Sequence, residues 1–472
     1  MYEFTKIERI TPTLRPADER VGNFNEISEV YSTSETASQA SRCVQCGNPY
    51  CSSVGCPLSN YIPQWLRFIA EKDLEQAFKI SNESSPFPEI LGRICPQDRL
   101  CEGACTLNDG NEEETIGAIT IGSIEVAISE KGFKKGFKPE FAEKMTGKKV
   151  AIVGSGPAGL SCATFLLRAG VKPVVFDKAD RAGGLLTYGI PGFKLEKAAV
   201  ERRVELLQEA GMELKLGVDI GNDVTLEQLN QDYDAVFLGI GAMAGRQLDD
   251  EAYNSDNIYM AVPFLTNIQK KIDEQQFDKK YDVTGKRVVV IGGGDTAMDC
   301  VRSSIREKAA KVTCFYRRDE ENMPGSRKEV RAAKDEGVEF NFLKSPKNFV
   351  ADDKGNVYGA KFVDMELSEP DASGRQAVTE VAGSEAIVEA DVFILALGFS
   401  NEKLGWITDA GVKTNQWGAI ETDAKGETSL PGVFAGGDSV RGADLVVTAA
   451  LDGREAAMSI LESIFEKEPA TV

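Results

Sequence analysis

The 472-residue sequence contains no histidine. This absence excludes Ser-His-Asp and Cys-His nucleophilic catalysis, and it excludes haem or zinc that is bound through imidazole. The chemistry must therefore come from carboxylates, lysines, cysteines or a bound cofactor. Hydride and electron transfer satisfy this restriction, because the cofactor carries the reaction.

A basic excess and long apolar runs are also missing. No run approaches the roughly 18 apolar residues of a membrane span. The N-terminal stretch MYEFTKIERI lacks the apolar segment of a signal peptide, so we expect a cytoplasmic protein. Lys and Arg number 54 and Asp and Glu number 74, and the net charge of -20 argues against nucleic acid or an anionic membrane as the main partner. The length predicts about three domains at roughly 150 residues each.

Cysteine, in contrast, is concentrated near the N-terminus. The spacing is C-x2-C-x4-C-x4-C-P and then C-x5-C-x3-C, formed by Cys43, Cys46, Cys51, Cys56, Cys95, Cys101 and Cys105. Such runs are typical of iron–sulfur clusters, with zinc and a disulfide framework as the alternatives. Two [4Fe–4S] clusters need eight ligands, so another side chain must serve or one cluster is incomplete. The other three cysteines, Cys162, Cys300 and Cys314, lie in apolar segments and are expected in the core.

The segment around these cysteines has a helical pattern. Ile62 to Ile80 carries large apolar side chains at near-helical spacing, which predicts core packing. We expect residues 1–145 to form a small helical domain clamped by its clusters. The Lys- and Gly-rich stretch from Gly132 to Gly147 predicts the linker that follows it.

Residues 148–177 predict a βαβ unit that binds a dinucleotide. KKVAIVG and VKPVVFD are the strands, and GSGPAG is the turn into the helix between them. Gly154, Gly156 and Gly159 would let a pyrophosphate approach the helix N-terminus. Asp177, at the end of the second strand, would accept a hydrogen bond from a ribose hydroxyl.

Residues 287–318 predict a second unit of this kind, with GGGDTA as its turn. Arg317 and Arg318 stand where an acid would end the strand, which favours the 2′-phosphate of NADP(H) over NAD(H). The alternative is a pair of solvated arginines. Arg327 and Lys328 would add positive charge nearby. The residues expected to contact NADPH are Gly292, Gly294, Asp295, Thr296, Ala297, Arg317 and Arg318.

Two dinucleotide sites in one chain predict FAD at the first and a visiting nicotinamide nucleotide at the second. The strands at 234–241 and 391–398 would lie where the chain crosses between the two units. We therefore expect a discontinuous FAD domain at 146–262 and 391–472, and an NADPH domain at 263–390. Near the end of the chain, Gly437 and Asp438 follow a strand, and the carboxylate could accept from the flavin ribityl chain. An ordinary turn aspartate is the alternative.

Together these motifs resemble the small (beta) subunits of bacterial NADPH-dependent glutamate synthases and the related module of dihydropyrimidine dehydrogenase. The motifs are CVQCGNPYC, GRICPQDRLCEGACTLN, TIGSIE, GSGPAGL, DRAGGLLTYGIPGFKL, GGGDTAMDC and FAGGDSVRG. The resemblance implies an α/β fold, in which a helical iron–sulfur domain precedes two Rossmann-like domains of the glutathione reductase and adrenodoxin reductase type. It also implies an electron-input subunit, in which NADPH reduces FAD and two [4Fe–4S] clusters pass electrons to a large (alpha) subunit. That subunit would form L-glutamate from 2-oxoglutarate and glutamine.

The resemblance also assigns residues to the cofactors. Carried over by position, one cluster would be held by Cys43, Cys46, Cys51 and Cys105. The other would be held by Cys56, Cys95, Cys101 and Glu125, where relatives have Gln or Glu as the eighth ligand. A solvated acid is the alternative at Glu125, and the four residues between Cys51 and Cys56 are one more than in dihydropyrimidine dehydrogenase relatives. We also expect Gly184 and Lys194 beside the flavin, where Lys194 would stabilise its reduced anion.

Two other functions remain open at the level of sequence. One is a stand-alone or differently partnered NADPH oxidoreductase that reduces ferredoxin or another acceptor. The other is a non-enzymatic assembly protein with structural zinc. Because we identify no glutaminase nucleophile, the chain alone is not expected to make glutamate.

Overall fold

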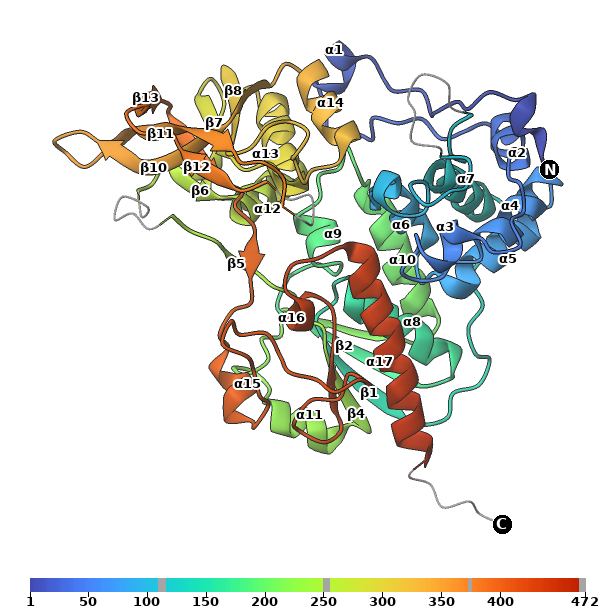
Figure 1. The fold of residues 1–472 in the computed structure, drawn as a ribbon. Coiled ribbons are helices and arrows are strands. Elements are labelled where there is room, and N and C mark those ends of the chain that lie inside the picture. The colour runs from blue at the N-terminus through green and yellow to red at the C-terminus, as the bar shows by residue number, and fades with distance from the viewer. Residues whose placement is uncertain (109–115, 249–254, 372–375, 467–472) are drawn as a thin grey trace.

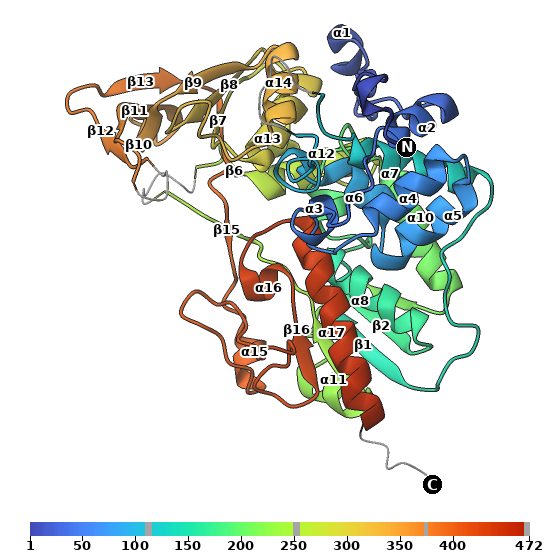
Figure 2. The ribbon, with the colours of Figure 1, turned by 45° about the vertical axis from the view of Figure 1, so that its right-hand side comes forward.

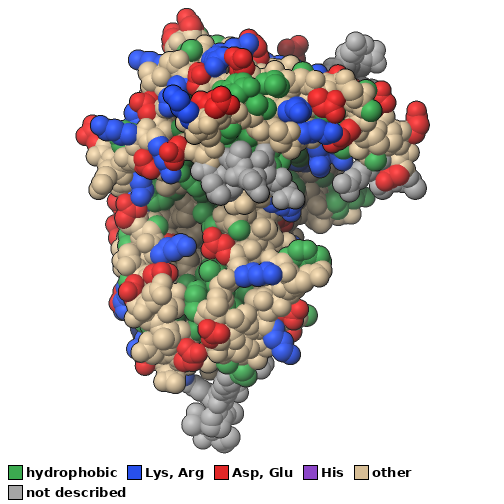
Figure 3. All heavy atoms as spheres, turned by 90° about the vertical axis from the view of Figure 1, so that its left-hand side faces the viewer, with side chains coloured by type: hydrophobic (Ala, Val, Ile, Leu, Met, Phe, Trp, Pro, Cys, Tyr) green, Lys and Arg blue, Asp and Glu red, His purple; other side chains and the backbone are tan. Residues whose placement is uncertain are grey.

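The computed structural model describes residues 1–108, 116–248, 255–371 and 376–466. A helical N-terminal domain lies beside two α/β units, which are stacked one above the other (Figure 1). On the face in Figure 3, acidic and basic side chains are interspersed. Within the described ranges, no helix has the length and the apolar character needed to cross a membrane.

The N-terminal domain packs its helices around an apolar core that includes Trp65, whose side chain is fully buried. The helices are α1 (Ala17–Arg20), α2 (Thr33–Ser41), α3 (Tyr50–Ser53), α4 (Ile62–Ala70), α5 (Leu74–Ser84), α6 (Pro88–Ile94) and α7 (Ile121–Lys134). The apolar stripe expected from Ile62 to Ile80 spans two helices, because Lys72 has a φ of 66° and Asp73 caps α5. The predicted linker is also too long: α7 continues to Lys134, and Gly132 is buried against Phe78.

The first nucleotide unit has a parallel sheet of five strands in the order β16-β4-β1-β2-β3. The strands are β1 (Lys149–Val153), β2 (Lys172–Asp177), β3 (Glu213–Leu216), β4 (Ala235–Leu238) and β16 (Val433–Ala435). Its main helices are α8 (Pro157–Arg168), α10 (Lys197–Glu209), α11 (Leu226–Asp232) and α17 (Val446–Glu466). Helix α17 runs along α8, and its N-terminal end reaches towards the N-terminal domain (Figure 2).

The second nucleotide unit repeats this design with the strand order β6-β14-β7-β8-β9, again parallel. The strands are β6 (Ile258–Met260), β7 (Arg287–Ile291), β8 (Lys311–Tyr316), β9 (Glu339–Phe342) and β14 (Val392–Leu395). The helices are α12 (Ala261–Ile272), α13 (Asp295–Arg306) and α14 (Arg327–Asp335). An antiparallel sheet of β10 (Lys344–Ala351), β11 (Val357–Leu367), β12 (Val378–Glu380) and β13 (Ala386–Glu389) follows β9. The two units confirm the predicted α/β fold.

The expected domain boundaries need correction. The prediction assigns β6 and β14 to the FAD domain, but both strands pair in the second sheet. The chain crosses instead at β5 (Ala244–Gly245) and β15 (Phe399–Ser400), which pair with each other in an antiparallel ribbon. The error arises because β14 and β4 are equally apolar four-residue strands, and such a strand does not reveal which parallel sheet it joins.

Candidate electron-transfer site

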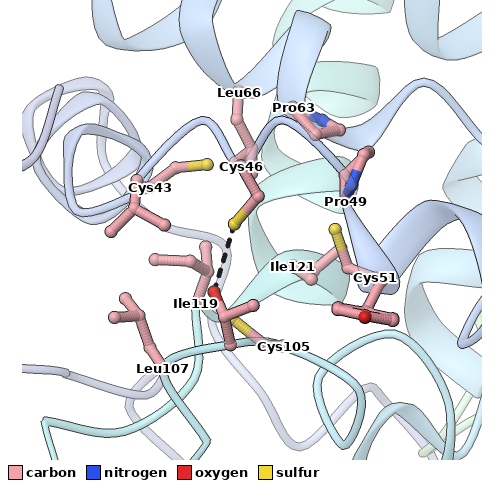
Figure 4. Close-up of a pocket in the computed structure, with 13 residues that line it drawn as sticks. Cys43, Cys46, Pro49, Cys51, Pro63, Leu66, Cys105, Leu107, Ile119 and Ile121 are labelled. Atoms are coloured by element: carbon pink, nitrogen blue, oxygen red, sulfur yellow. Dashed lines mark hydrogen bonds between the residues drawn. The ribbon is translucent and has the colours of Figure 1, made fainter.

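Four of the N-terminal cysteines line one pocket of the helical domain (Figure 4). Cys43, Cys46 and Cys51 come from the segment between α2 and α4, and Cys105 comes from the chain before α7. The pocket walls are largely apolar, and burial raises the pKa of the Cys51 thiol to about 12. A thiol in such surroundings becomes a thiolate when a metal binds it. The pocket therefore suits a cluster ligated by four thiolates; from here on it is called the first cluster pocket.

Cys56, Cys95, Cys101 and Glu125 line a second cluster pocket. Glu125 lies in α7 and is 6% exposed, so the structure does not place it as a solvated acid. Burial raises the pKa of its carboxyl to about 8 and raises the pKa of the Cys95 and Cys101 thiols well above the ordinary value. These groups favour their neutral forms when no metal is bound, and they would ionise as ligands of a cation, which the iron of a cluster would supply.

A hydrogen-bond network that the sequence did not reveal orients Glu125. Asn60 Nδ2 donates to Glu125 Oε1 over 2.7 Å. Asn60 Oδ1 in turn accepts from Trp65 Nε1 at 3.3 Å and from Ser84 Oγ at 2.7 Å. The network fixes the Asn60 amide and so directs one carboxylate oxygen of Glu125. The residues of this network come from separate segments of the chain, so their spacing in the sequence does not predict these hydrogen bonds.

The geometry also bears on the zinc alternative. Among the residues that the structure describes, no group of three Cys, Asp or Glu side chains is arranged to hold a single metal ion. A structural zinc site needs four ligands at about 2.0–2.3 Å from one ion. Each pocket is instead lined by four of the eight ligands that two [4Fe–4S] clusters need.

The turn before α8 has the shape expected of a pyrophosphate site. Gly154 has a φ of 100°, and a Cβ there would lie 2.3 Å from the Gly239 carbonyl oxygen. Gly156 caps α8 without a side-chain partner, and a Cβ at Gly156 would meet no atom within 4 Å. Gly159 lies within the first turn of α8, and Gly184 packs against Gly156. Open space therefore lies in front of the free N–H groups of a helix N-terminus, which suits a dinucleotide phosphate.

Two carboxylates lie close to this turn. Asp177 Oδ2 accepts from the Ser155 backbone N at 2.7 Å and from the Ser155 hydroxyl, so Asp177 holds the turn as well as ending β2. Asp438 begins α16 (Asp438–Arg441) directly after Gly437, which has a φ of 71°. Burial raises the pKa of the Asp438 carboxyl to about 7. A partly buried carboxyl at this position suits a hydrogen bond with a bound polar group.

The second turn repeats the arrangement. Gly294 caps α13 without a side-chain partner, and a Cβ there would meet no atom within 4 Å. Asp295, the first residue of α13, accepts from the Ser326 backbone N at 3.0 Å, and Thr296 and Ala297 follow it. Gly292 precedes this turn with a φ of 149°. The N-terminus of α13 is therefore open to a second dinucleotide.

Arg317 and Arg318 follow β8 beside this turn. Arg317 is exposed, whereas Arg318 Nε is buried and has no hydrogen-bond partner in the described part of the chain. A buried guanidinium nitrogen without an acceptor is costly unless an anion binds it. A 2′-phosphate would supply that acceptor.

Lys194 occupies a contact between the two nucleotide units. Its Nζ lies 2.9 Å from Asp299 Oδ1 in α13 and 4.0 Å from Glu329 Oε2 in α14. Lys194 is therefore engaged in an ion pair between the units, and its role beside the flavin stays a prediction. Sequence reasoning assigned no role to Asp299, although it lies within the motif GGGDTAMDC, and none to Glu329 of α14.

Lys194 belongs to a larger set of buried charges that joins all three parts of the molecule, here called the junction cluster. Its members are Arg20, Lys194, Asp299, Arg302, Arg306, Glu329 and Glu336. Glu336 accepts from Arg20 Nε at 2.9 Å and from Arg306 Nη1 at 2.6 Å. Phe193 of the first unit lies under the guanidinium groups of Arg302 and Arg306, at 4.3 and 4.0 Å from its ring centroid.

Comparisons with known proteins support both an iron–sulfur domain and a dinucleotide-binding part in this chain. Residues 20–137 match the family described as dihydropyrimidine dehydrogenase domain II, 4Fe-4S cluster, and residues 148–453 match the pyridine nucleotide-disulphide oxidoreductases. The chain is 48% identical to the glutamate synthase [NADPH] small chain of Escherichia coli (strain K12) over 98% of both chains. It is 46% identical to the protein of that name in Halomonas elongata, again over 98% of both.

Among solved structures, the Mycobacterium tuberculosis protein FprA in complex with NADPH matches with a TM-score of 0.57 and 18% identity. The match covers 68% of this chain and 85% of FprA, and it supports the fold of the two nucleotide units. The near full-length identity to the bacterial proteins goes further and confirms the resemblance inferred from the motifs. The chain therefore belongs to the family of small chains of NADPH-dependent glutamate synthases.

Proposed function

We propose that this chain is the electron-input subunit of a glutamate synthase. It oxidises NADPH and passes the electrons to a large subunit that forms L-glutamate from 2-oxoglutarate and glutamine. The observation that carries the proposal is the division of seven cysteines and Glu125 between two pockets of a chain that also has two open nucleotide turns. Bound FAD accepts a hydride from NADPH, and bound [4Fe–4S] clusters carry single electrons.

The protein's task in this reaction is binding and orientation. The α8 N-terminus, with Gly154 and Gly156, would hold the FAD pyrophosphate, and Asp177 and Asp438 would face its hydroxyl groups. The α13 N-terminus, with Arg317 and Arg318 beside it, would hold NADPH. The junction cluster keeps the two units in one relative orientation, which would hold two bound nucleotides in fixed positions for hydride transfer.

The pockets also suggest the order of the clusters. Val447 of α17 lines the second cluster pocket, and α17 follows Asp438 of the flavin site closely in the chain. The second pocket therefore adjoins the flavin unit. Tyr50, which lines the first pocket, is 48% exposed, and Val54, directly after α3, is 70% exposed. We propose that electrons enter at the second pocket and leave through the first, where the large subunit would dock.

The partner and the location form part of the same proposal. Relatives named small chains, aligned over nearly their full length, favour a large-subunit partner over a stand-alone NADPH oxidoreductase that reduces ferredoxin. Cluster thiolates persist in a reducing compartment, so we place the protein in the cytoplasm.

Co-expression of the chain with a glutamate synthase large subunit tests the proposal. We expect a stable complex that forms glutamate from 2-oxoglutarate and glutamine with NADPH, while the chain alone makes none. The opposite result would be a chain that binds no large subunit and reduces ferredoxin at full rate by itself. That result would favour the stand-alone reductase.

A further inference from the structure

Two cations reach the second cluster pocket, and each comes from a different nucleotide unit. Arg454 belongs to α17 of the first unit, and Lys328 belongs to α14 of the second. Neither residue belongs to a cysteine motif or to a glycine-rich turn. Both contact segments of the N-terminal domain that line the pocket.

Arg454 contacts the loop that carries Cys56. Its Nη1 donates to the Leu58 carbonyl oxygen at 2.8 Å and to the Ser84 carbonyl oxygen at 3.3 Å, and Leu58 lines the pocket two residues after Cys56. Cys56 and Leu58 line the same pocket, so the hydrogen bond to the Leu58 carbonyl brings the Arg454 guanidinium onto the loop that carries this sulfur.

Lys328 contacts the loop that carries Cys95. Its Nζ donates to Gln97 Oε1 at 3.2 Å, and Gln97 also lines the pocket. Gln97 is itself fixed, because its Nε2 donates to the Gly92 carbonyl oxygen at 2.8 Å. Lys328 as a residue is exposed and Arg454 is half-buried, so solvent screening weakens the Lys328 charge more.

We propose that Arg454 and Lys328 raise the reduction potential of the cluster held by Cys56, Cys95, Cys101 and Glu125. One electron that enters this cluster adds one negative charge, and no bond forms or breaks. A cation nearby stabilises the reduced state, and local charge is one of the factors that set cluster potentials. The inference rests on the proposed function, because the second pocket must hold a cluster.

The arrangement has a consequence for electron flow. The Lys328 charge is present only while the second unit stays docked on the N-terminal domain. The junction cluster, which includes Glu329 beside Lys328, holds it there. Docking of the NADPH unit and electron acceptance by the second cluster are thereby coupled. Arg454 supplies the larger, constant part of the effect.

Redox titration with dithionite, followed by EPR on anaerobically purified holoprotein, tests this inference. We expect R454M to lower the midpoint potential of one cluster by up to about 59 mV, which is a tenfold change in the equilibrium constant of a one-electron couple. K328M should lower the same potential by less, and the other cluster should keep its potential. R454K and K328R, which retain the charge, should restore most of the wild-type value.

Two control variants remove comparable contacts at other positions. Arg168 of α8 donates to the carbonyl oxygens of Asn82 and Glu83, so R168M removes a similar clamp on the N-terminal domain. Lys334 lies in α14 like Lys328 but pairs with Glu320. We expect neither R168M nor K334M to move a potential. An equal shift in R454M and R168M, or no shift in R454M, would overturn the inference.

Iron and sulfide content, measured on every preparation, separates this inference from the proposed function. A wild-type protein without clusters overturns the proposed function. Intact clusters with an unshifted potential in R454M overturn only the present inference. If R454M does not assemble the second cluster, R454Q is measured instead. We expect the same lowering of the cluster midpoint potential in R454Q, because the introduced amide can still donate to the Leu58 carbonyl.

Discussion

At the scale of single residues, we propose that a carboxylate completes a set of thiolates in the second cluster pocket. Glu125 is buried in α7 and receives one hydrogen bond, from Asn60, so its remaining lone pairs can face the pocket. A buried carboxyl with a pKa of about 8 is costly to ionise by itself. A cluster iron would offset that cost, which explains why an acid can occupy this apolar site.

Replacing Glu125 with Ala should remove a ligand of the second cluster and leave the first cluster intact. We expect the iron content to fall from about eight to about four per chain, since each [4Fe–4S] cluster holds four irons. Metal analysis and EPR measure this loss. E71A, at an exposed glutamate at the end of α4, is the control and should keep both clusters. An unaltered EPR spectrum in E125A would show that Glu125 is not a ligand.

Replacing Arg317 and Arg318 together, as R317D/R318Q, should move the preference from NADPH towards NADH. The phosphate would lose charge-assisted hydrogen bonds worth about 1.5–3 kcal/mol, which corresponds to a roughly 10- to 100-fold fall in kcat/KM for NADPH. Steady-state kinetics with a small acceptor and both nucleotides measure the ratio, and the NADH value serves as the internal control. An unchanged ratio would place the 2′-phosphate elsewhere.

At the scale of helices and strands, the sequence predicts which segments form elements better than it predicts which other segments those elements pair with or pack against. The glycine turns at Gly154 and Gly292 were predictable because a close backbone approach leaves a local signature. The cysteine pockets followed from spacing together with a family resemblance. The sheet that β14 joins, the break between α4 and α5, and the Asn60 network depend on contacts between distant segments. Periodicity and spacing do not report such contacts.

Helix α7 offers a test at this scale. A Cβ at Gly132 would lie 2.2 Å from the Phe78 ring of α5, so G132A should overpack the contact between α5 and α7. We expect a loss of about 1–3 kcal/mol in the free energy of unfolding, in spite of the better helix propensity of Ala. Chemical denaturation followed by circular dichroism measures the loss. G405A in α15 (Gly405–Asp409), where the nearest atom would be 3.8 Å away, should be near neutral. A G132A protein as stable as wild type would show that Phe78 moves freely.

At the scale of the whole molecule, the junction cluster ties the N-terminal domain and both nucleotide units together. Arg20 comes from the N-terminal domain, Lys194 from the first unit, and Arg302, Arg306 and Glu336 from the second. Separation of the units would leave these charges buried without partners or would expose them to water. The units are therefore expected to hold one orientation during electron transfer.

Glu336 is the centre of this contact, and E336Q tests it. Burial acts to raise the pKa of Glu336, but hydrogen bonds from Arg302 and Arg306 outweigh it and lower the pKa to about 2. Because the folded pKa lies below the ordinary value of about 4.3, the stabilisation is fully present above that pH and is lost as the pH falls towards 2. At pH 7, E336Q should cost about 3–5 kcal/mol, since it leaves buried arginines without their partner.

Hydrogen exchange of α13 and α14, compared between wild type and E336Q, measures this loss where it occurs. The control is E320Q, which removes the exposed partner of Lys334 and should change little. Between pH 8 and pH 5 the difference between wild type and E336Q should stay constant. Equal protection of α13 and α14 in both proteins would show that the junction cluster does not hold the units together.

The function inferred for this chain is to carry electrons from NADPH through FAD to two iron–sulfur clusters. Anaerobic titration of the purified chain with NADPH tests it most directly, with visible absorption, EPR, and flavin, iron and sulfide analysis on the same sample. We expect a coloured protein with one FAD and about eight irons with matching sulfide per chain, whose flavin is reduced by NADPH. A protein reconstituted without oxygen that holds neither flavin nor sulfide would contradict it.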